Sequence, residues 1–150
     1  MVILFLHRIW PSYGGGETVT KCLANEFVKR GHKVFVLYTK RSSNDDPDLD
    51  SRIVQTYIPD VHYDEKSSEF FVDKCLARKV NTFVDKYIID HHIEIIINQW
   101  WPVEFLENLK NRDRIKIIKC LHMDPDTRKV LDFSGIKGMV FKDHFFSAGS

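Results

Sequence analysis

Three consecutive glycines are the residues of this chain whose type and spacing best suit chemistry. Gly14, Gly15 and Gly16 lie between an apolar stretch that ends at Leu6 and an amphipathic one that begins at Val19. Glycines let the main chain approach a ligand because no Cβ intervenes, and the first turn of a following helix leaves its N–H groups without intrahelical partners. Those donors and the positive end of the helix dipole favour a phosphate or diphosphate. The same residues also fit a strand-to-helix turn that binds nothing.

The segments on either side of this turn predict a βαβ unit. Residues 2–6 and 34–38 are continuous apolar runs, as expected for strands buried on both faces of a parallel sheet. A right-handed crossover between them would place the glycine turn at the carboxyl edge of the sheet. The predicted inward face of the intervening helix consists of four apolar residues: Val19, Cys22, Leu23 and Phe27.

The rest of the chain continues the alternation of strand and helix patterns. Further strands are predicted at residues 52–58, 93–97, 115–121 and 136–141, and helices over residues 68–90 and from Pro102. The helix from Pro102 is expected to bury Phe105, Leu106 and Leu109. We therefore expect residues 1–150 to form a single α/β domain with a Rossmann-like open sheet, mainly parallel, and helices on both faces.

Composition and charge exclude several classes of protein. The 150 residues are 43% hydrophobic, enough for one sizeable core, and 22 basic against 21 acidic residues argue against a general nucleic-acid binder. No apolar run approaches the roughly 20 residues that span a bilayer, so a cytoplasmic protein is expected. No metal is expected either. Cys22, Cys75 and Cys120 are too widely spaced for zinc, and His91-His92 precedes a strand at the edge opposite the glycine turn.

Two other phosphate-binding motifs do not fit. In the dinucleotide fingerprint G-x-G-x-x-G, counting from Gly14 puts Val19 at the third glycine, and the second predicted strand ends at Tyr38 and Thr39 instead of an acid. No Gly-Lys-Ser/Thr follows Gly16, so the Walker pattern fails too. A nicotinamide enzyme and a nucleoside-triphosphate hydrolase are both disfavoured.

Two segments resemble GT-B glycosyltransferases, particularly the family 4 type. Residues 14–34 are similar to the N-terminal signature of these enzymes, a glycine-rich loop with Glu and then a helix reading roughly Leu-Ala-x-x-Leu-x-x-x-Gly-His-x-Val. Residues 117–122 are similar to the apolar strand ending in His that these enzymes place at the interdomain cleft. The resemblance covers most of residues 1–125.

The resemblance implies the N-terminal domain of a two-domain enzyme that transfers a sugar from a nucleotide-sugar to a glycan or lipid-linked acceptor. In such enzymes the N-terminal half mainly binds the acceptor and contacts the donor diphosphate. The C-terminal half holds the nucleotide and carries two glutamates in an E-x7-E arrangement, which this chain lacks. The nucleotide-sugar domain is therefore expected to be absent from this chain, and the chain alone to be inactive. No cofactor is implied, because the nucleotide-sugar is a co-substrate.

By the resemblance, Gly14, Gly15 and Gly16 would bind the donor diphosphate and His122 would act at the reacting centre. A strand-end His122 bonded to a carbonyl is the alternative, and for Glu17 a structural role at the helix dipole is preferred. The candidate acceptor-binding residues follow predicted strands at the same edge: Trp10, Asn98, Gln99, Trp100, Trp101 and Asp124. Aromatic faces suit sugars or lipid, but they equally suit a lid over the core.

Three alternatives stay open at this point. A basic cluster at residues 110–116 fits peripheral contact with anionic lipid at the inner face of a membrane, although a solvated charged turn is preferred. A non-catalytic α/β module that binds a ligand or partner would bind saturably without a second domain. A GT-B-like nucleotide-sugar epimerase would form product from the donor without any acceptor.

Overall fold

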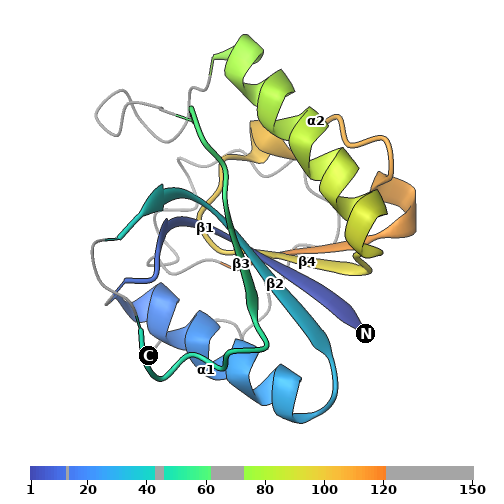
Figure 1. Cartoon of the computed structure of the whole chain (residues 1–150). Coiled ribbons are helices and arrows are strands. Elements are labelled where there is room, and N and C mark those ends of the chain that lie inside the picture. Colours follow the sequence, from blue (N-terminus) through green and yellow to red (C-terminus); the bar gives the residue numbers. More distant parts are fainter. Residues whose placement is uncertain (13, 43–45, 62–72, 121–150) are drawn as a thin grey trace, which may run out of the picture.

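The computed structural model describes residues 1–12, 14–42, 46–61 and 73–120, which form an open sheet flanked by helices (Figure 1). The strands of this sheet are all parallel and lie in the order β3-β2-β1-β4-β5. This confirms the predicted Rossmann-like α/β fold. The elements, in chain order, are β1 (Val2–Trp10), α1 (Gly15–Lys29), β2 (Lys33–Arg41), β3 (Val54–Tyr57), α2 (Lys74–His91), β4 (Ile95–Asn98), the short 3-10 turns η1 (Val103–Phe105) and η2 (Arg112–Arg114), and β5 (Lys116–Lys119).

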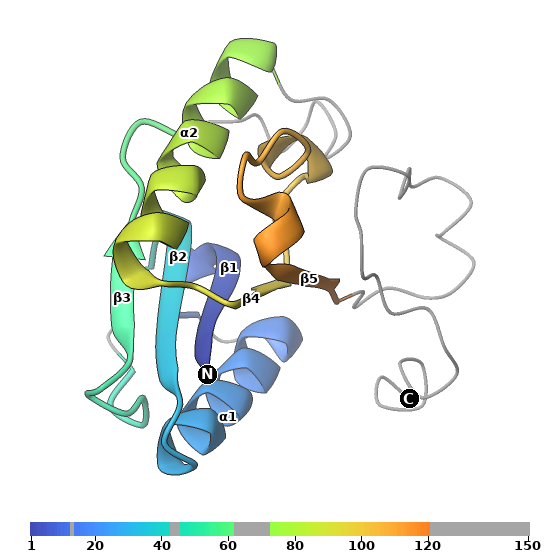
Figure 2. The ribbon, with the colours of Figure 1, turned by 90° about the vertical axis from the view of Figure 1, so that its right-hand side faces the viewer.

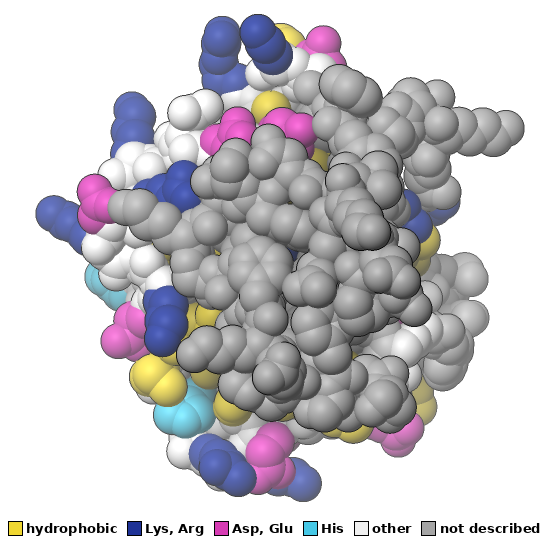
Figure 3. Space-filling model, turned by 180° about the vertical axis from the view of Figure 1, so that it is seen from behind, with side chains coloured by type: hydrophobic (Ala, Val, Ile, Leu, Met, Phe, Trp, Pro, Cys, Tyr) yellow, Lys and Arg dark blue, Asp and Glu magenta, His cyan; other side chains and the backbone are white. Residues whose placement is uncertain are grey.

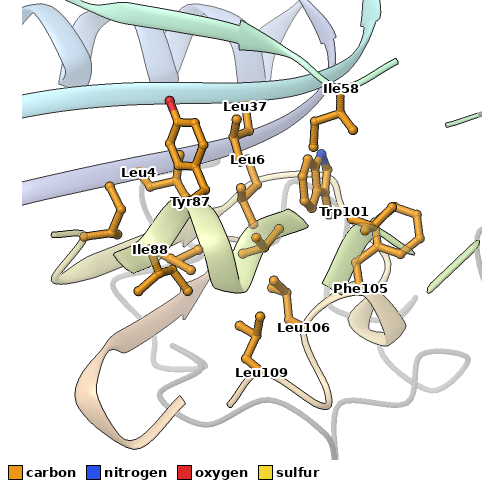
Figure 4. Close-up of a cluster of buried hydrophobic side chains, with 14 of the residues drawn as sticks. Leu4, Leu6, Leu37, Ile58, Tyr87, Ile88, Trp101, Phe105, Leu106 and Leu109 are labelled. Atoms are coloured by element: carbon orange, nitrogen blue, oxygen red, sulfur yellow. The ribbon is translucent and has the colours of Figure 1, made fainter. Parts of the chain in front are cut away.

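The two helices cover opposite faces of the sheet, as predicted (Figure 2). Because side chains alternate along a strand, Ile3 and Phe5 of β1 pack on the α1 side, whereas Leu4 and Leu6 pack on the α2 side. From behind, basic and acidic side chains are interspersed around the margin of the described surface (Figure 3). The core on the α2 side is the larger of the two and includes Trp101 and Phe105 (Figure 4).

The inward face of α1 differs from the one that the sequence predicted, since of the four predicted residues Phe27 alone packs against the core, with its ring stacked on that of Phe5. Val19 and Leu23 are 45% and 37% exposed, and Cys22 is exposed as well. The buried residues are Gly16, Thr20, Ala24 and Val28. These small residues, spaced by four, let the helix lie close to the sheet, and the hydroxyl of Thr20 has a buried partner in β1. Polar Thr20 therefore points inward, while the apolar residues beside it face outward.

The segment after β4 buries the predicted residues without forming the predicted helix. Phe105, Leu106 and Leu109 are all buried, but η1 is a 3-10 turn of 3 residues. In a helix, the main-chain N–H and carbonyl groups of this segment would bond to one another. Here side chains from α2 bond to them instead: the Nδ2 of Asn81 donates to the carbonyl of Phe105, and the carboxylate of Asp85 accepts from the Lys110 amide. Anchors of this kind stabilise an irregular segment that passes over a helix.

Strands β1 and β2 continue past the other strands at the carboxyl edge. The last β1–β4 pair is Leu6 with Asn98, whereas the β1–β2 pairing continues as far as Trp10 with Arg41. The strand predicted at residues 115–121 is described as β5, which ends at Lys119. Residues 68–72 of the predicted second helix and the predicted strand at residues 136–141 lie outside the described residues.

Replacing Asp85 with alanine should lower the free energy of unfolding by about 1–2 kcal/mol, because the Lys110 and Asn111 amides lose their acceptor. Urea denaturation measures this loss. Asp90→Ala serves as the matched control on the same helix, since Asp90 pairs with exposed Lys86 and its loss should change stability by less than about 0.5 kcal/mol. Equal effects of the two substitutions would contradict the anchoring role of Asp85.

Candidate functional site

The sheet order creates a switch point between β1 and β4. From β1 the chain runs outward through β2 to β3, and on the other side lie β4 and β5. In open α/β sheets, ligands bind in the crevice outside the carboxyl ends of the two strands where the order reverses. The glycine turn follows β1, and residues 99–101 follow β4. The Gln99 amide donates to the Leu6 carbonyl over 3.1 Å, so the two segments start side by side at this edge.

The glycine turn forms the N-terminus of α1, at the edge where the sequence placed it. Gly14 is the N-cap, with φ −133° and ψ 171°, and its carbonyl accepts from the Thr18 amide. Gly15 is exposed, and a Cβ added to it would meet nothing within 4 Å. The turn does not need glycine for a left-handed conformation. What the glycines provide is a helix terminus whose first amide can be approached closely.

Glu17 lies against the N-cap. Its carboxylate packs on the α-carbon of Gly14, where an added Cβ would clash with it. A carboxylate in the first turn interacts favourably with the helix dipole. This placement agrees with the structural role that we prefer for Glu17, and it leaves the approach to Gly15 open.

Three of the predicted acceptor-binding side chains point into the protein. Trp10 and Trp101 are each 1% exposed, and their indole N–H groups donate to the Oε1 of Gln55 and the carbonyl of His7. The buried amide of Asn98 brackets Trp101, since its Oδ1 accepts from the Trp101 amide and its Nδ2 donates to the Trp101 carbonyl. Asn98 and Trp101 therefore shape the segment after β4, whereas Trp10 packs in the core on the α1 side.

The neighbouring candidates differ in exposure. Gln99 is buried, whereas Trp100 is partly exposed at the same edge. The Cys120 amide donates to the Asn98 carbonyl, so the chain leaving β5 starts beside this segment. His122 and Asp124 follow immediately and lie outside the described residues.

The remaining polar groups near the site have clear environments. Burial raises the pKa of the Cys120 thiol, which therefore stays protonated near neutral pH. Lys119 donates from its Nζ to the Trp101 carbonyl.

In the described ranges, no group of three His, Cys, Asp or Glu side chains could hold a metal ion. A hollow of about 370 Å³ lies at the opposite edge, between the end of α1 and the start of β2, and is lined by residues such as His32 and Lys33.

His7 belongs to this site, although the sequence reading ended the first strand before it. It is 0% exposed, its Nε2 shares a 2.6 Å hydrogen bond with the Thr20 hydroxyl, and its ring lies 4.9 Å from that of Trp10. Strand alternation carries a signal for it, because His7 continues the face of Ile3 and Phe5 toward the helix. A polar residue at that position needs a polar partner on the helix, and Thr20 supplies it.

Comparison with known proteins shows a likeness of fold. No protein-family model and no curated protein matches this sequence. Among solved structures, sucrose-phosphate synthase from Thermosynechococcus elongatus matches with a TM-score of 0.53 and 16% identity, over 89% of this chain and 36% of that one. A UGT transferase from Siraitia grosvenorii, solved in complex with UDP, matches with a TM-score of 0.52 and 11% identity, over 81% of this chain and 28% of that one.

The α/β fold of this chain is thus similar to part of each of these two structures. The chain spans only about a third of the length of each structure that it matches, 36% and 28%. Separately, none of the helices in the described part of the chain combines the length and apolar character needed to cross a membrane.

Proposed function

We propose that this chain is the N-terminal, acceptor-side half of a GT-B glycosyltransferase of the family 4 type. The complete enzyme transfers a hexose from a nucleotide-diphosphate sugar to a glycan or lipid-linked acceptor. The observation that carries the proposal is the open helix terminus at Gly15, set at the switch point of the sheet. The UDP bound by the Siraitia grosvenorii transferase, which shares the fold, supports a nucleoside diphosphate as part of the donor.

The glycine turn acts on the leaving group. As the bond between sugar and diphosphate breaks, negative charge grows on the diphosphate oxygens. The amides of Gly15 and Gly16 belong to the first helical turn, where N–H groups lack intrahelical acceptors. A helix terminus is already oriented before the reaction, so it stabilises this charge without reorganising. Gly14 completes the turn as its N-cap, with the Glu17 carboxylate packed against it, and the open approach for the diphosphate is at Gly15.

The acceptor lies against the segment after β4. Trp100 is partly exposed there and offers an aromatic face to a sugar ring or lipid, with Gln99 beside it. Asn98 and Trp101 support this surface from within, through the hydrogen bonds described above. By the family resemblance we assign His122 to the reacting centre and Asp124 to acceptor binding, and Cys120, which precedes them, lies at this edge.

The second half of the enzyme supplies the nucleotide-binding site. The glutamate pair that the family uses is missing from this chain, so a C-terminal domain must provide it for transfer to occur. The enzyme works in the cytoplasm. Exposed Lys110, Arg114 and Lys116 around η2 offer a peripheral contact with an anionic membrane surface that would carry a lipid-linked acceptor.

A labelled-donor assay tests this function. The protein that includes the second domain is incubated with sugar-labelled nucleotide donors, with and without glycan or lipid-linked acceptors. We expect label in the acceptor only when the second domain and the acceptor are both present. Conversion of the donor without acceptor would identify an epimerase instead. Saturable binding without turnover, indifferent to the second domain, would identify a binding module.

A further inference from the structure

His7 lies at the base of the crevice, at the point where β1 loses one neighbouring strand. Leu6 forms the last β1–β4 pair with Asn98, and the next residue, His7, continues the strand pairing with Tyr38 of β2. Its side chain is 0% exposed, so it contacts no ligand in the crevice directly. Any influence of His7 on the site must therefore act through the residues that it holds.

One of those residues is in α1. The Nε2 of His7 and the hydroxyl of Thr20 share a 2.6 Å hydrogen bond, and both side chains are fully buried. The other buried residues of α1 are Gly16, which has no side chain, and Ala24 and Val28, which lie toward the other end. Thr20 is thus the first side chain along α1 that fixes the helix to the sheet from the inner face. Breaking a bond between two buried polar groups is costly, so this bond is a strong restraint.

The other residue, Trp101, is in the segment after β4. The indole N–H of Trp101 donates to the main-chain carbonyl of His7 over 2.6 Å. Trp101 is in turn held by Asn98, at the end of β4. His7 thereby bonds to α1 through its side chain and to the segment after β4 through its main-chain carbonyl.

We infer that His7 is a positioning residue that sets the first-turn amides of α1 against the segment after β4. This inference rests on the proposed function, since the amides it sets are those that we assign to the donor diphosphate. Displacement of a binding group by about 1 Å costs as much as a hundredfold in activity, so a restraint this close to Gly15 and Gly16 controls affinity.

Two substitutions of Thr20 isolate the bond from the fold. Thr20→Val keeps the shape of the side chain but removes the hydroxyl, whereas Thr20→Ser keeps the hydroxyl and loses a methyl group. If Thr20 acted through packing alone, serine would be at least as harmful as valine, because serine leaves a small void. A positioning role through His7 makes valine the harmful one and serine the rescue.

Amide hydrogen exchange of the free chain is the first measurement. The Thr18 amide donates to Gly14 at the start of α1, and the Arg30 amide donates to Glu26 at its end. We expect Thr20→Val to speed exchange at Thr18 by about tenfold while Arg30 stays unchanged, and Thr20→Ser to stay within about threefold at both. Unchanged exchange at Thr18, or equal acceleration at both ends, would overturn the inference.

The second measurement is UDP binding by the same variants, determined by isothermal titration calorimetry. We expect Thr20→Val to weaken UDP by about tenfold and Thr20→Ser by less than about threefold. Equal affinity of the valine variant and the original chain would overturn the link between His7 and the ligand. These titrations use the protein that includes the second domain, because that domain holds the nucleotide. If this protein bound no UDP even with Thr20 intact, the proposed function would fall, while hydrogen exchange would still decide whether His7 sets the start of α1.

Discussion

Replacing Gly15 with valine should weaken UDP binding by about tenfold to a hundredfold, the loss expected when one or two hydrogen bonds to a charged phosphate are blocked. A branched side chain at Gly15 would stand where the diphosphate approaches the first amides of α1. The fold should survive, since a Cβ at this position meets nothing within 4 Å. Titration calorimetry of the protein that includes the second domain measures the loss of UDP affinity, and a thermal unfolding curve of the same sample measures stability.

Gly31→Ala is the control for this experiment. Gly31 has φ +88°, a conformation that side chains rarely adopt, so alanine there should lower stability by about 1 kcal/mol and leave UDP affinity unchanged. Gly15→Val is thus expected to weaken UDP binding without lowering stability, whereas Gly31→Ala is expected to lower stability without weakening UDP binding. Undiminished UDP binding by Gly15→Val would remove the turn from the site.

Replacing Trp101 with alanine should lower the free energy of unfolding by about 3–5 kcal/mol. Trp101 is 1% exposed, its ring packs edge-on to Phe105 at 5.6 Å, and its N–H donates to His7. Since small domains are stable by only about 5–15 kcal/mol, this loss would leave little of the native state. Urea denaturation followed by circular dichroism gives the value.

Trp100→Ala is the matched control, one residue away. Trp100 is partly exposed, so its removal should cost less than half as much stability as that of Trp101 and should act mainly on acceptor binding in the complete enzyme. Similar losses of stability for both tryptophans would contradict the division of roles between them.

The fold could be predicted because its strands are apolar on both faces. Runs such as residues 2–6 and 34–38 have no polar face, and only a sheet covered on both sides buries them fully. The inner face of α1 could not be predicted in the same way. Hydropathy favoured Val19 and Leu23, but close approach to the sheet selects small residues, and the buried His7 selects Thr20.

The candidate site divides along similar lines. The glycine turn was placed at the correct edge because the βαβ crossover has a fixed hand. Which of the adjacent tryptophans is buried could not be predicted from the sequence. It depends on the end of β4 at Asn98 and on the hydrogen bond from the Trp101 amide to the Asn98 side chain. His7 was missed because the apolar run stops at Leu6, although the strand itself continues to Trp10.

The most direct test of the central claim is a UDP titration of the isotope-labelled protein that includes the second domain, monitored through the amide resonances of Gly15, Gly16 and Gly31. The site at the start of α1 predicts saturable shifts of Gly15 and Gly16, with Gly31 at the other end of the helix unmoved. Shifts confined to Gly31 and the neighbouring hollow at Lys33, or no saturable shift at Gly15 and Gly16, would contradict it.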